Sequence, residues 1–209
     1  MAQEKDSQIY GIGSRSYLAR ARGCLASGDR AQLFYAALEL RCCVEARQDE
    51  YLAAQKRYRK SMPRSWQIGK KACELDRIFA EGKIAKVTMS HPTAAQIVAF
   101  HIPIANALVK QAENLGAYLH AMQEFHDSDD PWWGILESAL SEIYRGAWLA
   151  CKGNLLCPPF LHADGTTNIA IEFDGDIPAH WEHYRKPGTR LVATVDYPSR
   201  PPADWKCDL

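Results

Sequence analysis

One segment limits the fold of this chain more than any other: "FYAALELRCCVEARQDEYL", residues 34–52. Its apolar side chains recur at intervals of three and four residues, which is the period of an amphipathic α-helix. Asp29 is a good N-cap and Pro63 ends helical geometry, so we predict one helix over residues 30–58. A helix this long is stable in water only when its apolar face is covered, and the sequence therefore predicts a helical bundle.

Three polar side chains fall on the face of this helix that should contact the core. With residue 33 at zero, Gln48, Arg41 and Glu45 lie at about 60°, 80° and 120° around the helix. Arg41 and Glu45 are four residues apart, so their side chains can contact each other. Three interpretations are open: a structural pair between helices or subunits, a phosphate or carboxylate clamp made by Arg41 and oriented by Glu45, or acid–base catalysis by Glu45.

The other segments divide the chain into a helical part and a β-rich part. Periodicity and capping residues predict further helices over 14–27 (with Ser14 as N-cap), 66–81, 106–126 and 132–152. β-Branched runs predict short strands at 84–91, 96–104, 168–173 and 189–197. We therefore predict an α+β, mainly α protein. A bundle of about five helices over 1–153 would carry a small β insertion at about 84–104, with a β-rich C-terminal segment, 154–209, packed on it.

Composition excludes several classes of function. The 25 Lys and Arg balance the 25 Asp and Glu, so no overall charge attracts nucleic acid or a membrane surface. No apolar run is long enough to cross a bilayer, and the first residues lack the apolar core of a signal peptide. We therefore expect a cytoplasmic protein with no membrane association. The seven cysteines lack zinc-binding spacing, so we expect free thiols, no metal and no cofactor.

Charge is nevertheless separated along the chain. Residues 51–73 hold seven basic side chains and no acidic one: Lys56, Arg57, Arg59, Lys60, Arg64, Lys70 and Lys71. Residues 111–144 hold seven acidic side chains and neither Lys nor Arg. The basic block could bind the phosphates of a nucleic acid, with Tyr58 and Trp66 available for stacking. It could equally be a solvated helix end, or the basic end of one subunit could meet the acidic helices of another.

Motifs that would name a reaction are absent from the sequence. No P-loop, dinucleotide fingerprint, HExxH or GxSxG is present. His180 and His183 are three residues apart, and Asp174 or Asp176 lies nearby, but such a set in a short loop is a weak indication of a metal. The catalytic residues are therefore unknown, with Arg41 and Glu45 as the candidates.

The helix pattern resembles a known family. "AALELRCCVEARQDEYL", followed by "SWQIGKKACELDRIF", is similar to the helical core of HEPN-type domains over residues 14–80, and more loosely to residue 153. The resemblance implies a small helical bundle found in bacterial toxin–antitoxin and antiphage defence systems, where many members are dimeric ribonucleases. Those ribonucleases carry an Arg followed four to six residues later by a His, and no Arg of this chain has a His at those offsets.

Together these features lead to two hypotheses. The first is a non-catalytic interaction or regulatory module that forms a homo-oligomer or docks on a protein partner, in the defence setting that the resemblance implies. The second is an RNA- or nucleotide-binding protein, or a phosphate-directed enzyme, that uses Arg41, Glu45 and the basic residues between 56 and 71.

Overall fold

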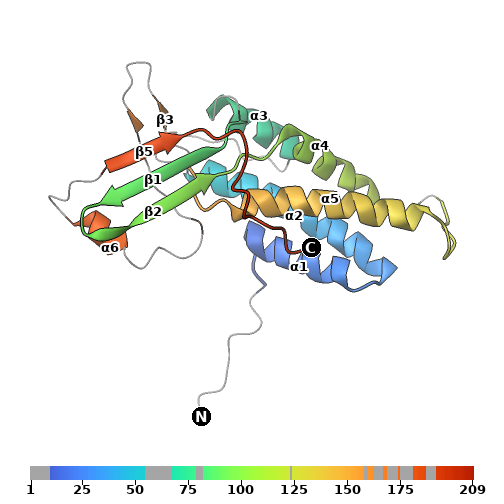
Figure 1. Cartoon of the computed structure of the whole chain (residues 1–209). Helices are drawn as coiled ribbons and strands as arrows, with labels where there is room; N and C mark the ends of the chain where they lie inside the picture. The colour runs from blue at the N-terminus through green and yellow to red at the C-terminus, as the bar shows by residue number, and fades with distance from the viewer. Residues whose placement is uncertain are drawn as a thin grey trace, which may run out of the picture.

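The computed structural model describes residues 10–54, 67–78, 82–122, 124–157, 160–161, 167–168, 174, 181–186 and 192–209. Within these ranges the protein is α+β and mainly helical, as the sequence predicts. The long helices lie together at one end of the molecule and a small sheet lies beside them at the other (Figure 1). The predicted end of the long helix, and the basic residues at positions 56–64, lie outside the described ranges.

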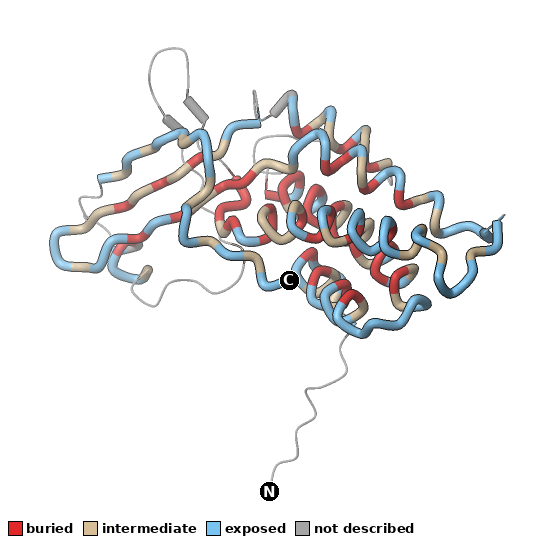
Figure 2. The backbone as a smooth tube through the Cα atoms, turned by 45° about the vertical axis from the view of Figure 1, so that its right-hand side comes forward, coloured by how far each residue is buried: buried red, intermediate tan, exposed pale blue. Residues whose placement is uncertain are grey.

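The bundle is built around α2, Arg30–Ala54. Around it lie α1 (Ser14–Ala26), α3 (Ile68–Ile78), α4 (Asn106–Asn114), the 3-10 helix η2 (Leu115–Leu119) and α5 (Trp132–Lys152). Small buried residues on α2, such as Ala36, Ala37 and Cys43, let neighbouring helices approach closely. The buried side chains gather on the facing sides of the helices (Figure 2). Each buried leucine or valine contributes roughly 1.5–3 kcal/mol, so this core is what holds the helices together.

Local signals set the helix ends. Gly28 has a φ of +70°, a left-handed conformation that stops α1, and the Asp29 carboxylate accepts the Ala31 N–H at 2.9 Å to start α2. These features confirm the predicted turn. The prediction for Ser14 was wrong: Gly13 is the N-cap, and Ser14 is the first helical residue. Its N–H and its hydroxyl both donate to the Glu50 carboxylate, each at 2.7 Å. A charged acceptor of this kind forms a stronger hydrogen bond than a neutral one.

The sheet joins two distant parts of the sequence. The predicted hairpin is present as β1 (Ala85–His91) and β2 (Ala94–His101), and β5 (Val192–Asp196) pairs with the other side of β1. All three strands are antiparallel, with Val87 opposite Ala99 on β2 and Val195 on β5. The sheet therefore unites the predicted insertion with the C-terminal segment. Of the predicted strand 168–173, only residue 168 is described; it belongs to β4 (Thr167–Asn168), which pairs with β3 (Phe160–Leu161).

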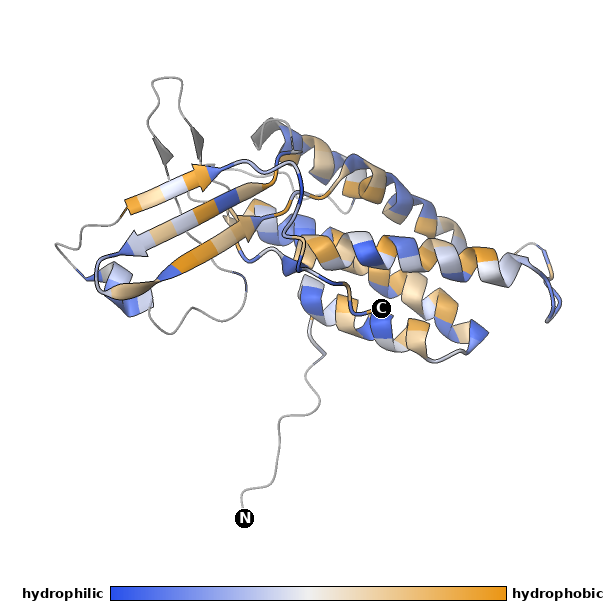
Figure 3. Ribbon diagram, viewed as in Figure 1, coloured by the Kyte–Doolittle hydropathy of each residue, from blue (hydrophilic) through white to orange (hydrophobic). Residues whose placement is uncertain are grey.

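One face of the sheet has its own small core. Val87, Met89, Ile97 and Ala99 are buried there, and Tyr184 from the short helix α6 (Trp181–Arg185) packs against them. The hydropathy colouring shows the apolar residues of β2 continuing toward the bundle (Figure 3). At the C-terminus the chain returns to the bundle, and its end lies beside α1 and α5 (Figure 1). No helix within the described ranges has both the length and the apolar character needed to cross a membrane.

Candidate binding groove

The most deeply buried charge in the described chain lies where the bundle meets the sheet. Arg47 of α2 is 1% exposed, and all three of its guanidinium nitrogens donate hydrogen bonds. Nε donates to the Ala150 carbonyl at 3.1 Å and one Nη to the Gly153 carbonyl at 2.6 Å. The other Nη bonds the carboxylates of Glu50, at 2.9 Å, and Asp174. This arginine therefore ties α2 to the end of α5 and to the C-terminal segment.

The buried arginine keeps its charge because of these partners. Burial by itself lowers the pKa of Arg47, but the polar groups around it, Tyr51 foremost, more than offset this and raise the pKa. Its guanidinium also lies over the Tyr51 ring, 4.6 Å from the centroid. A fully paired, water-excluded arginine has no donor to offer a ligand, so Arg47 is structural.

Tyr51 and His101 lie next to this arginine and are also structural. The Tyr51 hydroxyl donates to the Ile102 carbonyl at 2.5 Å. The centroids of the Tyr51 and His101 rings are 4.8 Å apart. His101 Nδ1 lies 3.1 Å from the Leu155 carbonyl oxygen, to which it donates. Burial raises the pKa of Tyr51 to about 12 and lowers the pKa of His101 to about 4. Both groups are therefore neutral at pH 7 and poorly suited to acid–base catalysis there.

The structure separates the predicted Arg41–Glu45 pair. Arg41 instead donates to the carbonyls of Ala112 and Glu113 at the C-terminal end of α4, each at 3.3 Å. Glu45 lies 3.2 Å from Lys71 Nζ on α3, and Asp49 lies 2.7 Å from the same nitrogen. The expectation that Arg41 and Glu45 contact each other was wrong, because each finds a partner on a different neighbouring helix.

Gln48 is the one member of the predicted stripe that is fully buried. Its amide Nε2 donates to the Ile68 carbonyl at 3.1 Å, which joins α2 to the start of α3. Its Oε1 has no hydrogen-bond partner among the described residues. A small hollow of about 20 Å³ lies there, too small for a ligand, so Gln48 acts as a link between two helices.

The basic block is only partly described. Lys71 is 4% exposed, and both of its carboxylate partners lie on α2, so it is not available to bind phosphate. Lys70 is exposed, and with Arg41 it lines a shallow hollow of about 330 Å³ beside Glu113. Arg57, Arg59, Lys60 and Arg64 lie outside the described ranges.

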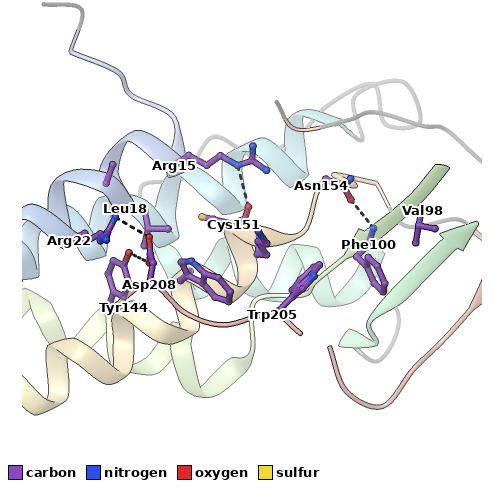
Figure 4. Close-up of a pocket in the computed structure, with 13 residues that line it drawn as sticks. Arg15, Leu18, Arg22, Val98, Phe100, Tyr144, Cys151, Asn154, Trp205 and Asp208 are labelled. Atoms are coloured by element: carbon purple, nitrogen blue, oxygen red, sulfur yellow. Dashed lines mark hydrogen bonds and ion pairs between the residues drawn. The ribbon is translucent and has the colours of Figure 1, made fainter. Parts of the chain in front are cut away.

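A larger groove, of about 610 Å³, lies between α1, the end of α5, β2 and the C-terminal tail. Figure 4 shows the side chains that line it. Three are cationic: Arg15 and Arg22, whose side chains are about half exposed, and the exposed Lys152. Trp148 and Trp205 are half-buried in its wall. The groove thus combines flat apolar surfaces with positive charge.

Each charge in the groove has a neighbour that fixes its position. Arg22 lies 3.3 Å from a carboxylate oxygen of Asp208, whose other oxygen accepts the Tyr144 hydroxyl at 2.7 Å. Arg15 Nε donates to the Cys151 carbonyl at 3.2 Å. The same nitrogen lies 3.2 Å from a carboxylate oxygen of Asp174. The Arg22–Asp208 pair is solvent-exposed and therefore weak, so a ligand carboxylate can replace or share it.

The tail residue Trp205 closes the groove on the sheet side. Its ring packs against the Phe100 ring with the centroids 5.3 Å apart. Phe100 is held in turn by Asn154, whose side-chain oxygen accepts the Phe100 N–H at 2.9 Å, and by the Leu155 N–H, which donates to the Phe100 carbonyl at 3.0 Å. Lys152 Nζ lies 5.9 Å from the centre of the Trp148 ring. The aromatic walls are therefore fixed before any ligand arrives.

The groove holds little that could do chemistry. Cys151 contributes to its wall, but its thiol is buried and lies 3.8 Å from the Cys43 sulfur. Within the described ranges, no cluster of three or more His, Cys, Asp or Glu side chains has the arrangement of a metal site.

Comparisons with known proteins give no assignment: no family model, no curated protein and no solved structure matches the chain. The HEPN-like resemblance stays a prediction. The argument about function therefore depends on the groove and the surfaces around it.

The sequence contained a signal for the buried arginine that periodicity could have found. On the wheel used above, Arg47 falls at about 320°, between Leu40 at about 340° and Ala36 at about 300°, all fully buried. The face of the helix that was predicted to contact the core was centred too far from Arg47, because the prediction counted Phe34, at about 100°, and Leu38, at about 140°, as core residues. Leu38 is exposed and Phe34 only half-buried. No comparable local signal marks the groove, whose residues range from position 15 to 208.

Proposed function

We propose that this protein is a non-catalytic interaction module whose groove binds an acidic, aromatic-bearing segment of a protein. The observation that carries the proposal is that one groove is lined by three cations, Arg15, Arg22 and Lys152, together with the rings of Trp148 and Trp205. Aromatic anchors and cations of this kind are common at protein interfaces. The cations attract carboxylates and set the register of the segment, while the tryptophan rings provide most of the contact area.

The mixed charge of the groove favours a protein ligand over a nucleic acid. Asp208 and Asp174 lie among the arginines and partly neutralise them. A phosphate backbone would meet these carboxylates along with the cations, whereas a peptide can place a neutral or donor side chain opposite each one.

The test is a binding measurement with a defined acidic peptide. A fluorescein-labelled peptide of sequence EFEDFEDFE should raise its fluorescence anisotropy when the protein is added, and a peptide with lysine in place of each acid should not. Arg22→Glu with Lys152→Glu should weaken the binding by about tenfold or more, since like charges then face each other. The matched control is Lys110→Glu with Arg145→Glu, two exposed cations that do not line the groove. Equal binding by both double variants would contradict the proposal.

A second candidate function is RNA or nucleotide binding, and one observation favours it. The exposed hollow between α2, α3 and α4 is lined by Arg41 and by Lys70, a member of the basic block. A labelled oligouridylate is the probe, with Lys70→Glu as the variant. If oligouridylate binds more tightly than the acidic peptide, loses affinity steeply with salt and depends on Lys70, this candidate replaces the first.

A further inference from the structure

The end of the bundle farthest from the sheet carries an unusual surface, which we call the tip: residues 119–122 and 124–137. It connects η2 to α5 and projects beyond the other helices (Figure 1). Phe125 is 87% exposed, the most exposed large hydrophobic side chain described, and Met122 and Ile135 are exposed near it in the sequence. An exposed apolar group of this kind on a folded surface is typical of an interaction site.

The tip also carries several acidic side chains, with Arg30 of α2 as a cation beside them. Glu124, Asp127, Asp129 and Glu137 are exposed, and no Lys or Arg occurs between residues 111 and 144. The tip therefore offers an aromatic side chain with carboxylates on both sides of it in the sequence, which is the chemistry that the groove is proposed to bind.

The tip is held in place by its own contacts. The ring of His126 stacks on Trp132, with the centroids 4.2 Å apart, and His126 Nδ1 lies 2.8 Å from the Asp130 carboxylate. The Trp133 indole donates to the Asp127 carbonyl at 3.0 Å, and Arg30 from α2 donates to the Ser128 carbonyl. Phe125 is thus presented on an ordered loop, which reduces the conformational entropy lost when it binds.

We propose that the occupant of the groove is the tip of a second copy of this chain. In this contact Phe125 of one copy packs between the tryptophan rings of the next, and Glu124 and Asp127 face Arg22 and Lys152. The inference rests on the proposed function, because it names the partner of that same groove. It is carried by the complementarity of two surfaces that one chain presents at separate places, one basic and aromatic, the other acidic with an exposed phenylalanine.

The arrangement has a definite consequence for assembly. The tip and the groove are different surfaces, so the contact is head-to-tail, and an open chain of copies keeps one free tip at one end and one free groove at the other until a ring closes. A symmetric dimer, by contrast, would use the same surface twice.

Two variants separate the surfaces. The groove variant is Arg22→Glu with Lys152→Glu, and the tip variant is Phe125→Ser with Glu124→Gln and Asp127→Asn. All five side chains are exposed, so both variants should fold, which circular dichroism and thermal unfolding check. Sedimentation velocity over a range of concentrations should show the wild-type chain forming dimers and larger species. Each variant alone should remain monomeric at those concentrations. The tip variant loses its aromatic anchor, which by itself weakens an interface by about 30-fold, and the groove variant places like charges opposite each other.

The decisive measurement is the mixture. Equal amounts of the two variants contain one intact groove and one intact tip, so they should form a 1:1 heterodimer that grows no further. A monomeric wild-type chain at every concentration, a tip variant that assembles like the wild type, or a mixture that stays monomeric would each overturn the inference. If the acidic peptide still binds the groove of a monomeric wild-type chain, the proposed function stands and only the second copy is excluded. If the peptide does not bind either, both proposals fail.

Discussion

Arg47 and Glu50 lie one turn apart on α2 and form an ion pair of 2.9 Å, although the arginine is 1% exposed. The pair is stable in the interior because each member has other partners. Glu50 accepts two bonds from Ser14 at the start of α1, and Arg47 donates to two carbonyls at the end of α5. One side-chain pair thus connects three helices.

Removing the arginine from this network should strongly destabilise the fold. Arg47→Met leaves the Glu50 carboxylate without its cation and Asp174 with Arg15 alone, and we expect the free energy of unfolding to fall by about 3–5 kcal/mol. Urea denaturation followed by circular dichroism measures the change. The control Arg145→Met, at an exposed position of α5, should change stability by only about 0.5 kcal/mol. Equal stability of the two variants would show that Arg47 is not needed for folding.

Two adjacent lysines should respond in opposite ways to the same substitution. Lys71→Glu places a third carboxylate next to Glu45 and Asp49 at a position that is 4% exposed, and we expect a loss of about 3–5 kcal/mol. Lys70→Glu changes an exposed side chain, and we expect a change within about 0.5 kcal/mol. Chemical denaturation of the two variants compares them directly. A mild effect of Lys71→Glu would mean that the lysine can turn out to solvent.

His101 should make the stability of the fold depend on pH. Its folded pKa of about 4 lies below the ordinary value of 6.5, so between these values the unfolded chain binds more protons than the folded one. The neutral His101 therefore contributes to the free energy of unfolding fully above pH 6.5. This contribution decreases as the pH falls toward 4, by about 3 kcal/mol in total. Denaturation curves at several pH values should show a weaker pH dependence for His101→Gln than for the wild type. Parallel curves for the two proteins would exclude a buried neutral histidine.

The cysteines should react in an order set by burial. Cys73 is exposed, Cys24, Cys42 and Cys207 are half-buried, and Cys43, Cys151 and Cys157 are buried. Burial also raises the pKa of the Cys24 and Cys42 thiols, which lowers their thiolate fraction at pH 7. With N-ethylmaleimide and mass spectrometry, we expect Cys73 to be modified first and the three buried thiols only after unfolding. Early modification of Cys43 would show that α2 and α5 separate in the native state.

The sequence by itself determined the local structure of this protein. The Gly28–Asp29 turn and the alternating strands of the hairpin are where the pattern places them, because caps, turns and side-chain periodicity act between residues that are close in the chain. The mainly helical α+β class follows from those elements.

Only the tertiary structure decided which polar residues were buried and which surfaces came together. Arg41 and Arg47 both donate to carbonyls at a helix end, but only Arg47 also faces carboxylates, which make its burial tolerable. One of those carboxylates, Asp174, is 127 residues away in the chain. The same holds for β5 beside β1 and for the groove, which combines α1, α5, β2 and the tail. Contacts between distant segments depend on how the helices and the sheet pack, and no local pattern of residues encodes that arrangement.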